Sequence, residues 1–260
     1  MIAAGFAWLA ALSDAAASPW NPPDGELLVI ARADYFTSDL GLLSVDGVDV
    51  PGEFERLESN TYLEYGVSER WMIGGKAFYG TSWLRRGDAT ERASGFTEVE
   101  GFVQRQLFRS PRHAGAIKVA TSVPSSFDSG VRPSLASDGV DAEFSALYGR
   151  TLSYRPVAAF AAVEVGYRKR FSDSADELRF LTTLGAEPIR NVVVLVDTFS
   201  VKSVRNERPG GADFDIVKVQ PSLIYRFSRR FAVQAGVSEE VAGRNISLGR
   251  TWFAGVRGRF

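Results

Sequence analysis

The sequence predicts an all-β protein, a twelve-stranded antiparallel transmembrane β-barrel with short periplasmic turns and longer extracellular loops. Three observations lead to this fold. From Glu26 onward, apolar and polar residues alternate in stretches long enough for a tilted strand to cross a bilayer, which takes about 9–11 residues. The breaks between these stretches alternate in length, as the two ends of such a barrel require. The number of stretches is even, so both ends of the barrel domain fall on the periplasmic side.

Composition excludes several classes of protein. The 260 residues carry 30 Lys and Arg against 31 Asp and Glu, so no basic excess predicts a nucleic acid partner. One His, two Met and no Cys argue against disulfides, thiolate metal sites and cysteine nucleophiles, and we expect no cofactor and no metal. The mean hydropathy is -0.06, and no apolar run after the N-terminus predicts a transmembrane helix. Because alternation dilutes an apolar face, this average is compatible with a β-barrel.

The N-terminus has the pattern of a secretory signal peptide. An apolar core spans residues 2–12, and Ala15 and Ala17 form an A-x-A cleavage signal before Ser18. Neither Lys nor Arg precedes the core, so a start further upstream and a mature helix stay open as alternatives. Three prolines follow Ser18 and oppose regular structure there. The predicted organisation is a signal peptide at 1–17, a periplasmic lead-in at 18–25 and a single barrel domain at 26–260.

The alternation itself places the strands. The twelve stretches, in chain order, are 26–36, 54–67, 71–84, 95–108, 115–124, 139–152, 157–171, 177–187, 191–202, 214–226, 230–238 and 246–260. In the second stretch, Leu57, Leu63 and Tyr65 share one face. Arg56 and Glu58 belong to the opposite face, which is too charged for a packed protein core.

Later stretches repeat this pattern with different clarity. In the seventh, Val163 and Val165 share one face and Glu164 and Arg168 the other. Apolar faces end near aromatic residues, as expected for a membrane-facing band that closes in an interfacial girdle. The ninth stretch is apolar on both faces, and the first and eleventh have a weak register. The inward faces of these three stretches therefore stay open.

The breaks predict the two ends of the barrel. The predicted extracellular loops are 37–53, 85–94, 125–138, 172–176, 203–213 and 239–245. The predicted periplasmic turns are 68–70, 109–114, 153–156, 188–190 and 227–229. Neither a helical period nor a domain linker interrupts the pattern after Asp24, so we predict one domain.

The C-terminal stretch gives the most specific local signal. Trp252, Val256 and the terminal Phe260 share one of its faces. A last strand that ends in Phe resembles the assembly signal of bacterial outer-membrane barrels. Together with Trp-Asn-Pro-Pro at residues 20–23 and EYGVSERWMIGG at residues 64–75, it resembles Gram-negative barrels of the phenol-degradation MetA-pathway family, which are described as transporters. The resemblance implies a bacterial outer-membrane location, contact with outer-membrane lipid and with the barrel-assembly machinery, and a small-molecule solute, and it carries over no catalytic residues.

Charged residues on the predicted inward faces are the candidate site. They are Arg56, Glu58, Glu64, Lys76, Glu98, Glu100, Lys118, Asp141, Glu143, Glu164, Arg168, Arg170, Arg179, Lys218 and Arg257. Charged side chains set permeation preferences in pores, so this set predicts a water-filled lumen. The alternative is an ion-pair network that braces and blocks the barrel. Twelve strands lie between the roughly eight of a filled barrel and the roughly 16–18 of an open channel.

These observations predict a narrow passive channel for small polar or aromatic solutes, and not an enzyme. The single His113 falls in a predicted inner turn, and carboxylate pairs such as Glu98 and Glu100 arise in any alternating strand, so neither predicts catalysis. A non-conducting barrel that binds a partner or reinforces the membrane is the alternative. A soluble lipocalin-like barrel is less favoured because it requires an apolar interior, whereas the predicted interior is charged.

Overall fold

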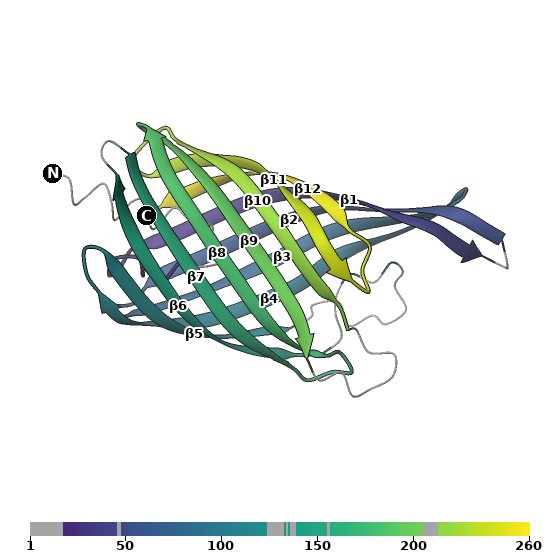
Figure 1. The fold of residues 1–260 in the computed structure, drawn as a ribbon, viewed down its shortest axis with the longest axis horizontal. Coiled ribbons are helices and arrows are strands. Elements are labelled where there is room, and N and C mark those ends of the chain that lie inside the picture. The colour runs from purple at the N-terminus through teal and green to yellow at the C-terminus, as the bar shows by residue number, and fades with distance from the viewer. Residues whose placement is uncertain are drawn as a thin grey trace.

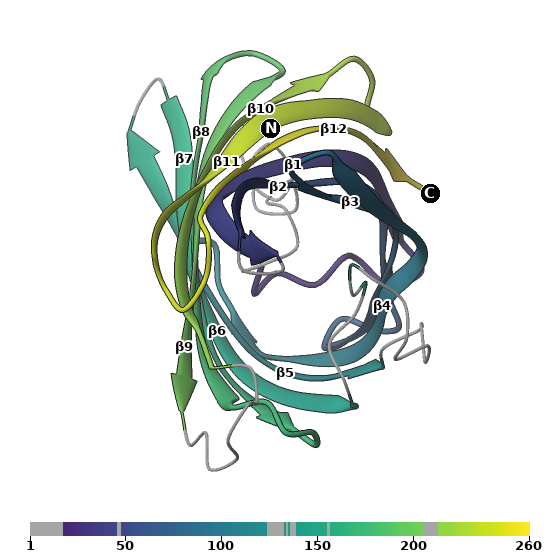
Figure 2. The ribbon, with the colours of Figure 1, turned by 90° about the vertical axis from the view of Figure 1, so that its right-hand side faces the viewer.

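Twelve strands form one closed antiparallel barrel (Figures 1 and 2). The structure, a computed structural model, describes residues 18–45, 48–123, 133, 135, 139–154, 157–204 and 213–260. Each strand pairs with its neighbours in the sequence, and β1 closes the ring against β12. The strands are β1 (Leu27–Val45), β2 (Val48–Gly66), β3 (Trp71–Arg86), β4 (Ala89–Arg109), β5 (His113–Val123), β6 (Asp141–Tyr154), β7 (Val157–Arg170), β8 (Asp176–Ile189), β9 (Val192–Val204), β10 (Asp215–Arg226), β11 (Phe231–Arg244) and β12 (Gly249–Arg259). Within the described ranges, no helix is long and apolar enough to span a bilayer.

An apolar belt surrounds the barrel. Every strand exposes at least one large apolar side chain on its outer face, among them Tyr35, Leu63, Tyr79, Val103, Val119, Phe144, Val165, Leu184, Val194, Leu223, Val233 and Trp252. The residues between them in sequence face inward, because successive side chains of a strand point to opposite faces. A continuous apolar exterior of this kind is stable against lipid and not against water. The predicted transmembrane barrel is thereby confirmed.

The two ends of the barrel differ in their connections. At one end, called here the terminal end, lie Phe260 and the turns that follow β2, β4, β6, β8 and β10. The opposite end, called the loop end, carries the connections that follow β1, β3, β5, β7, β9 and β11. At the terminal end, Ser68, Ser110 and Ser228 each accept the backbone N–H of the residue three positions on, at 2.9–3.1 Å. These hydroxyl groups satisfy backbone donors and so shape the short turns.

Three predicted loops are wrong in their extent. Most of 37–53 and of 85–94 is strand, because β1 and β2 pair as far as Val45 and Val48, and β3 and β4 as far as Arg86 and Ala89. Most of 239–245 is strand as well, since β11 continues to Arg244. The first two of these hairpins continue past the barrel rim (Figure 1). Outside a membrane a strand needs no apolar face, so the alternation that marks the membrane-spanning part ends before the ladder does. Charged pairs hold the extension, such as Arg85 with Glu53 at 3.3 Å.

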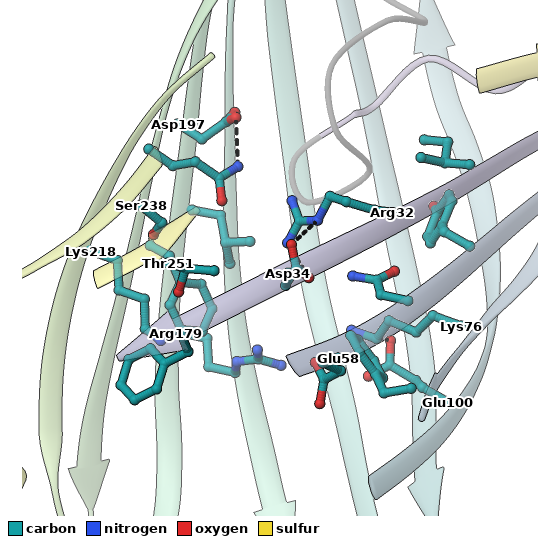
Figure 3. A pocket seen from close by; sticks show the side chains of 18 of the residues that line it. Arg32, Asp34, Glu58, Lys76, Glu100, Arg179, Asp197, Lys218, Ser238 and Thr251 are labelled. Carbon is teal, nitrogen blue, oxygen red and sulfur yellow. Dashed lines mark hydrogen bonds and ion pairs between the residues drawn. The ribbon is translucent and has the colours of Figure 1, made fainter. Parts of the chain in front are cut away.

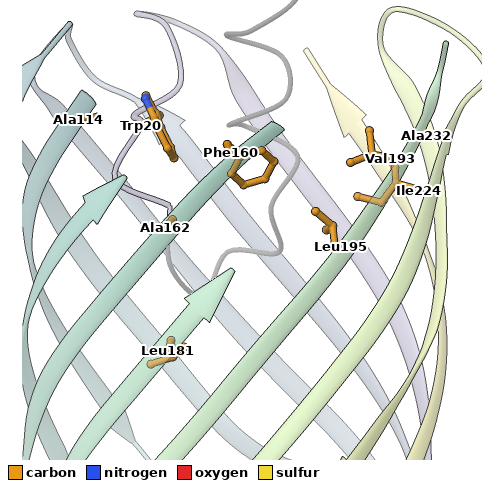
Figure 4. Packing of buried hydrophobic residues seen from close by; sticks show 9 residues of the cluster. All are labelled: Trp20, Ala114, Phe160, Ala162, Leu181, Val193, Leu195, Ile224 and Ala232. Atoms are coloured by element: carbon orange, nitrogen blue, oxygen red, sulfur yellow. The ribbon is translucent and has the colours of Figure 1, made fainter. Parts of the chain in front are cut away.

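Buried apolar side chains gather in the interior near the terminal end (Figure 4). Two clusters of buried apolar side chains lie there. The first comprises Trp20, Ala114, Phe160, Ala162, Leu181, Val193, Leu195, Ile224 and Ala232, and the second comprises Leu28, Ile30, Tyr62, Met72, Phe102 and Ala120. Glycines make room for the largest rings, since a Cβ at Gly149 or Gly185 would collide with Trp20 or Phe160. The barrel therefore has its apolar core inside the lumen, at one end.

An arginine on the lipid face tests the assignment of inner and outer surfaces. Val163 lies midway along β7, and its neighbours Glu164 and Ala162 are buried inside. We expect Val163→Arg to lower the free energy of unfolding by about 2–4 kcal/mol, because it places a charge at the bilayer midplane. Reversible urea unfolding in lipid vesicles measures this loss. Val163→Leu is the control and should change stability by less than about 1.5 kcal/mol; an equally small loss with Arg would contradict the assignment.

Candidate functional site

A cavity of about 610 Å³ occupies the barrel interior between the apolar clusters and the loop end (Figure 3). Toward the loop end it reaches Phe36 and Thr251, which pair across β1 and β12 close to the end of their ladder. Toward the terminal end it stops at Tyr62 and Phe102, whose rings stack with centroids 5.8 Å apart. Volumes of this size are typical of small-molecule pockets.

Ion pairs line the cavity wall. Lys76 Nζ lies 3.2 Å from Glu100 Oε1, and Lys118 Nζ lies 2.6 Å from Glu164 Oε1. A further pair joins Lys218 to the buried Glu240 at 2.7 Å. Two more pairs lie along single strands, Arg32 with Asp34 on β1 and Arg56 with Glu58 on β2. The wall thus carries both signs of charge, and each charged group has a partner close by.

Aromatic rings sit beneath several of these cations. The guanidinium carbon of Arg179 lies 5.0 Å from the centroid of Phe199, and that of Arg56 lies 5.5 Å from Phe54. The ammonium of Lys118 is 5.8 Å from the ring of Phe102. These distances fall within the range in which a ring face attracts a cation. The cavity therefore presents charged tips and aromatic surfaces side by side.

A single arginine gathers the carboxylates between the cavity and the loop end. Arg168 Nε lies 2.9 Å from Glu143 Oε2, and its Nη2 lies 3.0 Å from Glu100 Oε2. Its Nη1 lies 3.7 Å from Asp141 and 3.8 Å from Glu98. Because Glu98 and Glu100 belong to β4 and Arg168 to β7, these contacts cross the inside of β5 and β6. Arg168 therefore connects nonadjacent strands.

Further pairs extend this arginine's contacts into a network. Arg179 Nη1 reaches Glu143 Oε2 at 2.5 Å, and Arg170 lies 3.5 Å from Asp141 and 3.1 Å from Glu177. The network spans β3 to β8 on the interior face. Its arginines and carboxylates are mostly buried, so they compensate one another where water is scarce.

The segment before β1 packs inside the barrel at the terminal end. Gln104 Nε2 donates to Ser18 O at 3.1 Å and to Asn21 Oδ1 at 3.0 Å, and Gln106 Nε2 donates to Pro19 O at 2.7 Å. Trp20 packs edge-on against Phe160, with ring centroids 6.1 Å apart. Residues 18–21 are buried. We call residues 18–23 the N-terminal plug.

The predicted site residues fall into three places. Those that line the cavity are Arg56, Glu58, Lys76, Glu100, Lys118, Glu164, Arg179 and Lys218. Those held in the Arg168 network away from the cavity wall are Glu98, Asp141, Glu143, Arg168 and Arg170. Two lie deeper: Glu64 accepts the Tyr62 hydroxyl at 2.5 Å, and Arg257 Nε donates to Gln234 at 3.0 Å. Lys118 pairs with Glu164 on β7, two strands away, and its immediate strand neighbours are not its partners.

Sequence reasoning missed part of the site. Arg32, Asp34, Asp197 and Glu240 line the cavity, and all four come from β1, β9 and β11, the strands whose inward face the alternation left open. Aromatic residues of the wall were missed as well because rings occur on both faces of these strands. The two charged residues at positions i and i+2, Arg32 and Asp34, could have identified the inward face of β1. The N-terminal plug left no signal beyond its prolines.

Two other predicted features lie at the terminal end. His113 begins β5, and its Nδ1 lies 2.7 Å from the Tyr148 hydroxyl. Phe260 exchanges backbone hydrogen bonds with Leu27 at 2.9 and 3.0 Å, so β12 pairs with β1 up to the last residue. Residues 1–17, the predicted signal peptide, lie outside the described residues. Among the described residues, no group of three or more His, Cys, Asp or Glu is arranged to hold a metal ion.

Comparisons with known proteins bear on the fold. No model of a known family matches the sequence, and no curated protein matches it. An outer membrane channel from Pseudomonas putida F1 superposes with a TM-score of 0.64 at 11% identity, over 93% of this chain and 97% of that one. The NanC porin gives a TM-score of 0.60 at 8% identity, over 88% and 98%. The translocator domain of the autotransporter NalP from Neisseria meningitidis gives 0.52 at 11%, over 100% and 95%.

These similarities show that the chain has the fold of outer-membrane β-barrels. They confirm the predicted fold class and the resemblance of the sequence to such barrels. Channels, a porin and a translocator domain all share this fold, so the fold by itself does not select one activity.

Proposed function

We propose that the protein is an outer-membrane channel that admits small solutes at its loop end into the cavity and is closed at its terminal end in the state described here. The observation that carries this proposal is the division of the lumen into a charged cavity and an apolar closure. A barrel that only reinforced the membrane would need no cavity. In the membrane, the terminal end faces the periplasm and the loop end faces the outside, as the lengths of the connections suggest.

Several features support this proposal. The cavity has the volume and the mixed lining of a small-molecule site. The resemblance to the phenol-degradation family implies transport, and an outer membrane channel shares the fold. We propose that residues 1–17 direct export and that Phe260 marks the last strand for the assembly machinery. Passage and not catalysis is the activity, with outer-membrane lipid and a small solute as the partners.

Thiol labelling tests whether the cavity conducts. The chain contains no Cys, so a single introduced thiol reports on one position. Asn60 lines the cavity, whereas the adjacent Ser59 lies on the outer, lipid-facing surface. We expect a bulky hydrophilic thiol reagent to modify the Asn60→Cys protein and to reduce solute flux into proteoliposomes, because the adduct fills the entry path.

The Ser59→Cys protein is the matched control. It should resist the same reagent and keep its flux, since lipid covers that position. If the Asn60→Cys protein reacts fully while flux stays unchanged, solutes do not pass through the cavity.

A second candidate is a non-conducting barrel whose loop end binds a partner. The filled terminal half of the interior favours it. The two functions differ in the wild-type protein, because only a channel raises solute flux above that of protein-free liposomes.

A further inference from the structure

We propose that the cavity binds a small aromatic carboxylate. The inference rests on the proposed function, since it assigns a solute class to the same cavity. It starts from a comparison within each ion pair of the wall: which partner has the more exposed side chain.

The cation is the more exposed partner in every one of six pairs whose cation lines the cavity. The pairs are Arg32 with Asp34, Arg56 with Glu58, Lys76 with Glu100, Lys118 with Glu164, Arg179 with Glu143 and Lys218 with Glu240. The side chains of the cations are 14–34% exposed, and those of the carboxylates are 1–15% exposed. Asp197, a further carboxylate of the wall, is also buried and accepts the Thr183 hydroxyl at 2.6 Å. A solute in the cavity therefore finds more exposed surface on the N–H donors than on the carboxylates.

Because of this difference in exposure, the net charge of the wall differs from the charge that a solute in the cavity contacts most. The less exposed carboxylates keep the wall close to neutral, which avoids the cost of uncompensated buried charge. The cationic tips still have donors that point away from their partners, because an ammonium has three and a guanidinium five. Figure 3 shows Arg179, Lys76 and Lys218 arranged around the same cavity. Such a wall recognises an anion, and a carboxylate matches the guanidinium fork of Arg179.

Aromatic rings next to the cations define the rest of the solute. Phe199, Phe78, Phe102 and Phe54 each lie beside a wall cation, with cation-to-centroid distances of 5.0–5.8 Å. A solute ring can pack against one of these rings while its carboxylate reaches the neighbouring cation. An aliphatic anion lacks the ring contact, a neutral aromatic lacks the charged contact, and an aromatic ammonium meets like charge. Of these four classes, only the aromatic carboxylate satisfies both.

Calorimetry on the full-length protein in detergent tests the proposal with four probes at neutral pH. We expect benzoate to bind more tightly than acetate, benzyl alcohol and benzylammonium. Arg179→Gln should weaken benzoate binding by about tenfold, the effect of losing one charged hydrogen bond, and should leave benzyl alcohol unaffected. Arg168 keeps Glu143 compensated in this variant, so the barrel should fold.

Two further variants complete the design. Phe199→Leu should weaken benzoate and benzyl alcohol alike and leave acetate unchanged, because it removes a ring and no charge. Arg85→Gln is the matched control: Arg85 lies on the exposed hairpin extension, and its loss should not alter benzoate binding.

Three results would overturn the proposal: no measurable binding of benzoate, equal binding of benzoate and benzylammonium, or full benzoate affinity in the Arg179→Gln protein. Failure of the proposed function is a separate outcome, because it is read from flux and not from binding. If the protein passes neutral solutes but binds the four probes in a different order of affinity, the channel function stands and the aromatic carboxylate is wrong. If the protein binds benzoate most tightly but passes no solute, the binding site stands and the channel function is wrong.

Discussion

Replacing Arg168 by Met is expected to destabilise the barrel by about 3–5 kcal/mol, because the change leaves buried carboxylates without their shared cation. Glu143, Glu100 and Asp141 are buried, and all lie within 4 Å of this guanidinium. Among the described residues, Lys76, Lys118, Arg170 and Arg179 would then be the cations that remain beside the carboxylates of β4 and β6. Urea unfolding in lipid vesicles measures the loss, and the heat-dependent mobility shift in electrophoresis gives a second readout.

The control for Arg168 is an arginine whose pairs are exposed. Arg85→Met removes contacts to Glu53 and Glu55 outside the barrel and should cost at most about 1 kcal/mol. The double variant of Arg168→Met and Glu100→Gln should recover part of the loss, since it removes one of the uncompensated charges. If Arg168→Met is as stable as Arg85→Met, the network does not hold β4 to β7.

Opening the terminal end should increase the conductance of the barrel. Trp20 and Phe160 are the two aromatic rings among the buried residues of the first apolar cluster, and they pack edge-on against each other. We expect the double variant of Trp20→Ala and Phe160→Ala to give larger conductance steps in planar bilayers than the wild-type protein gives under the same conditions. The rings fill the lumen, and the backbone ladder of the wall does not depend on them, so the barrel should still form.

Phe171 provides the matched control for this opening. It lies just after β7 at the loop end and is exposed, so Phe171→Ala should leave conductance unchanged. A double variant that folds, as judged by its mobility shift, and conducts no more than the wild-type protein would show that these two rings do not form the barrier.

The alternation of apolar and polar residues along a strand predicts which side chains face inward well in the middle of this barrel and poorly at its terminal end. On β2, Arg56 and Glu58 lie inside and Leu57 and Leu63 outside, as the alternation predicts, because there the lumen is wet and the exterior is lipid. On β9, Val193 and Leu195 lie inside and Val194 lies outside. Both faces of β9 are apolar there, since one contacts the apolar closure and the other contacts lipid. The alternation gives no information where both the lumen side and the lipid side of a strand exclude water.

The same physical limit explains the other differences. The hairpin extensions beyond the rim were predicted as loops because water surrounds both of their faces, so neither face needs to be apolar. The N-terminal plug was predicted as a simple lead-in. Its contacts with Gln104 and Gln106 use the backbone carbonyl groups of Ser18 and Pro19 and the amide oxygen of Asn21, and these contacts follow no periodic pattern in the sequence. Contacts between nonadjacent strands, such as Arg168 with Glu100, follow from barrel curvature and not from any single strand.

The N-terminal plug has a consequence for the order of assembly. It directly precedes β1, and β1 is one side of the seam at which the ring closes against β12. The plug is therefore enclosed only when the last strand has arrived, so enclosure is a late event that depends on the whole chain. A barrel in which β1 has not yet paired with β12 would leave Trp20 and Phe160 uncovered. Sealing of the pore and completion of the wall are therefore the same step.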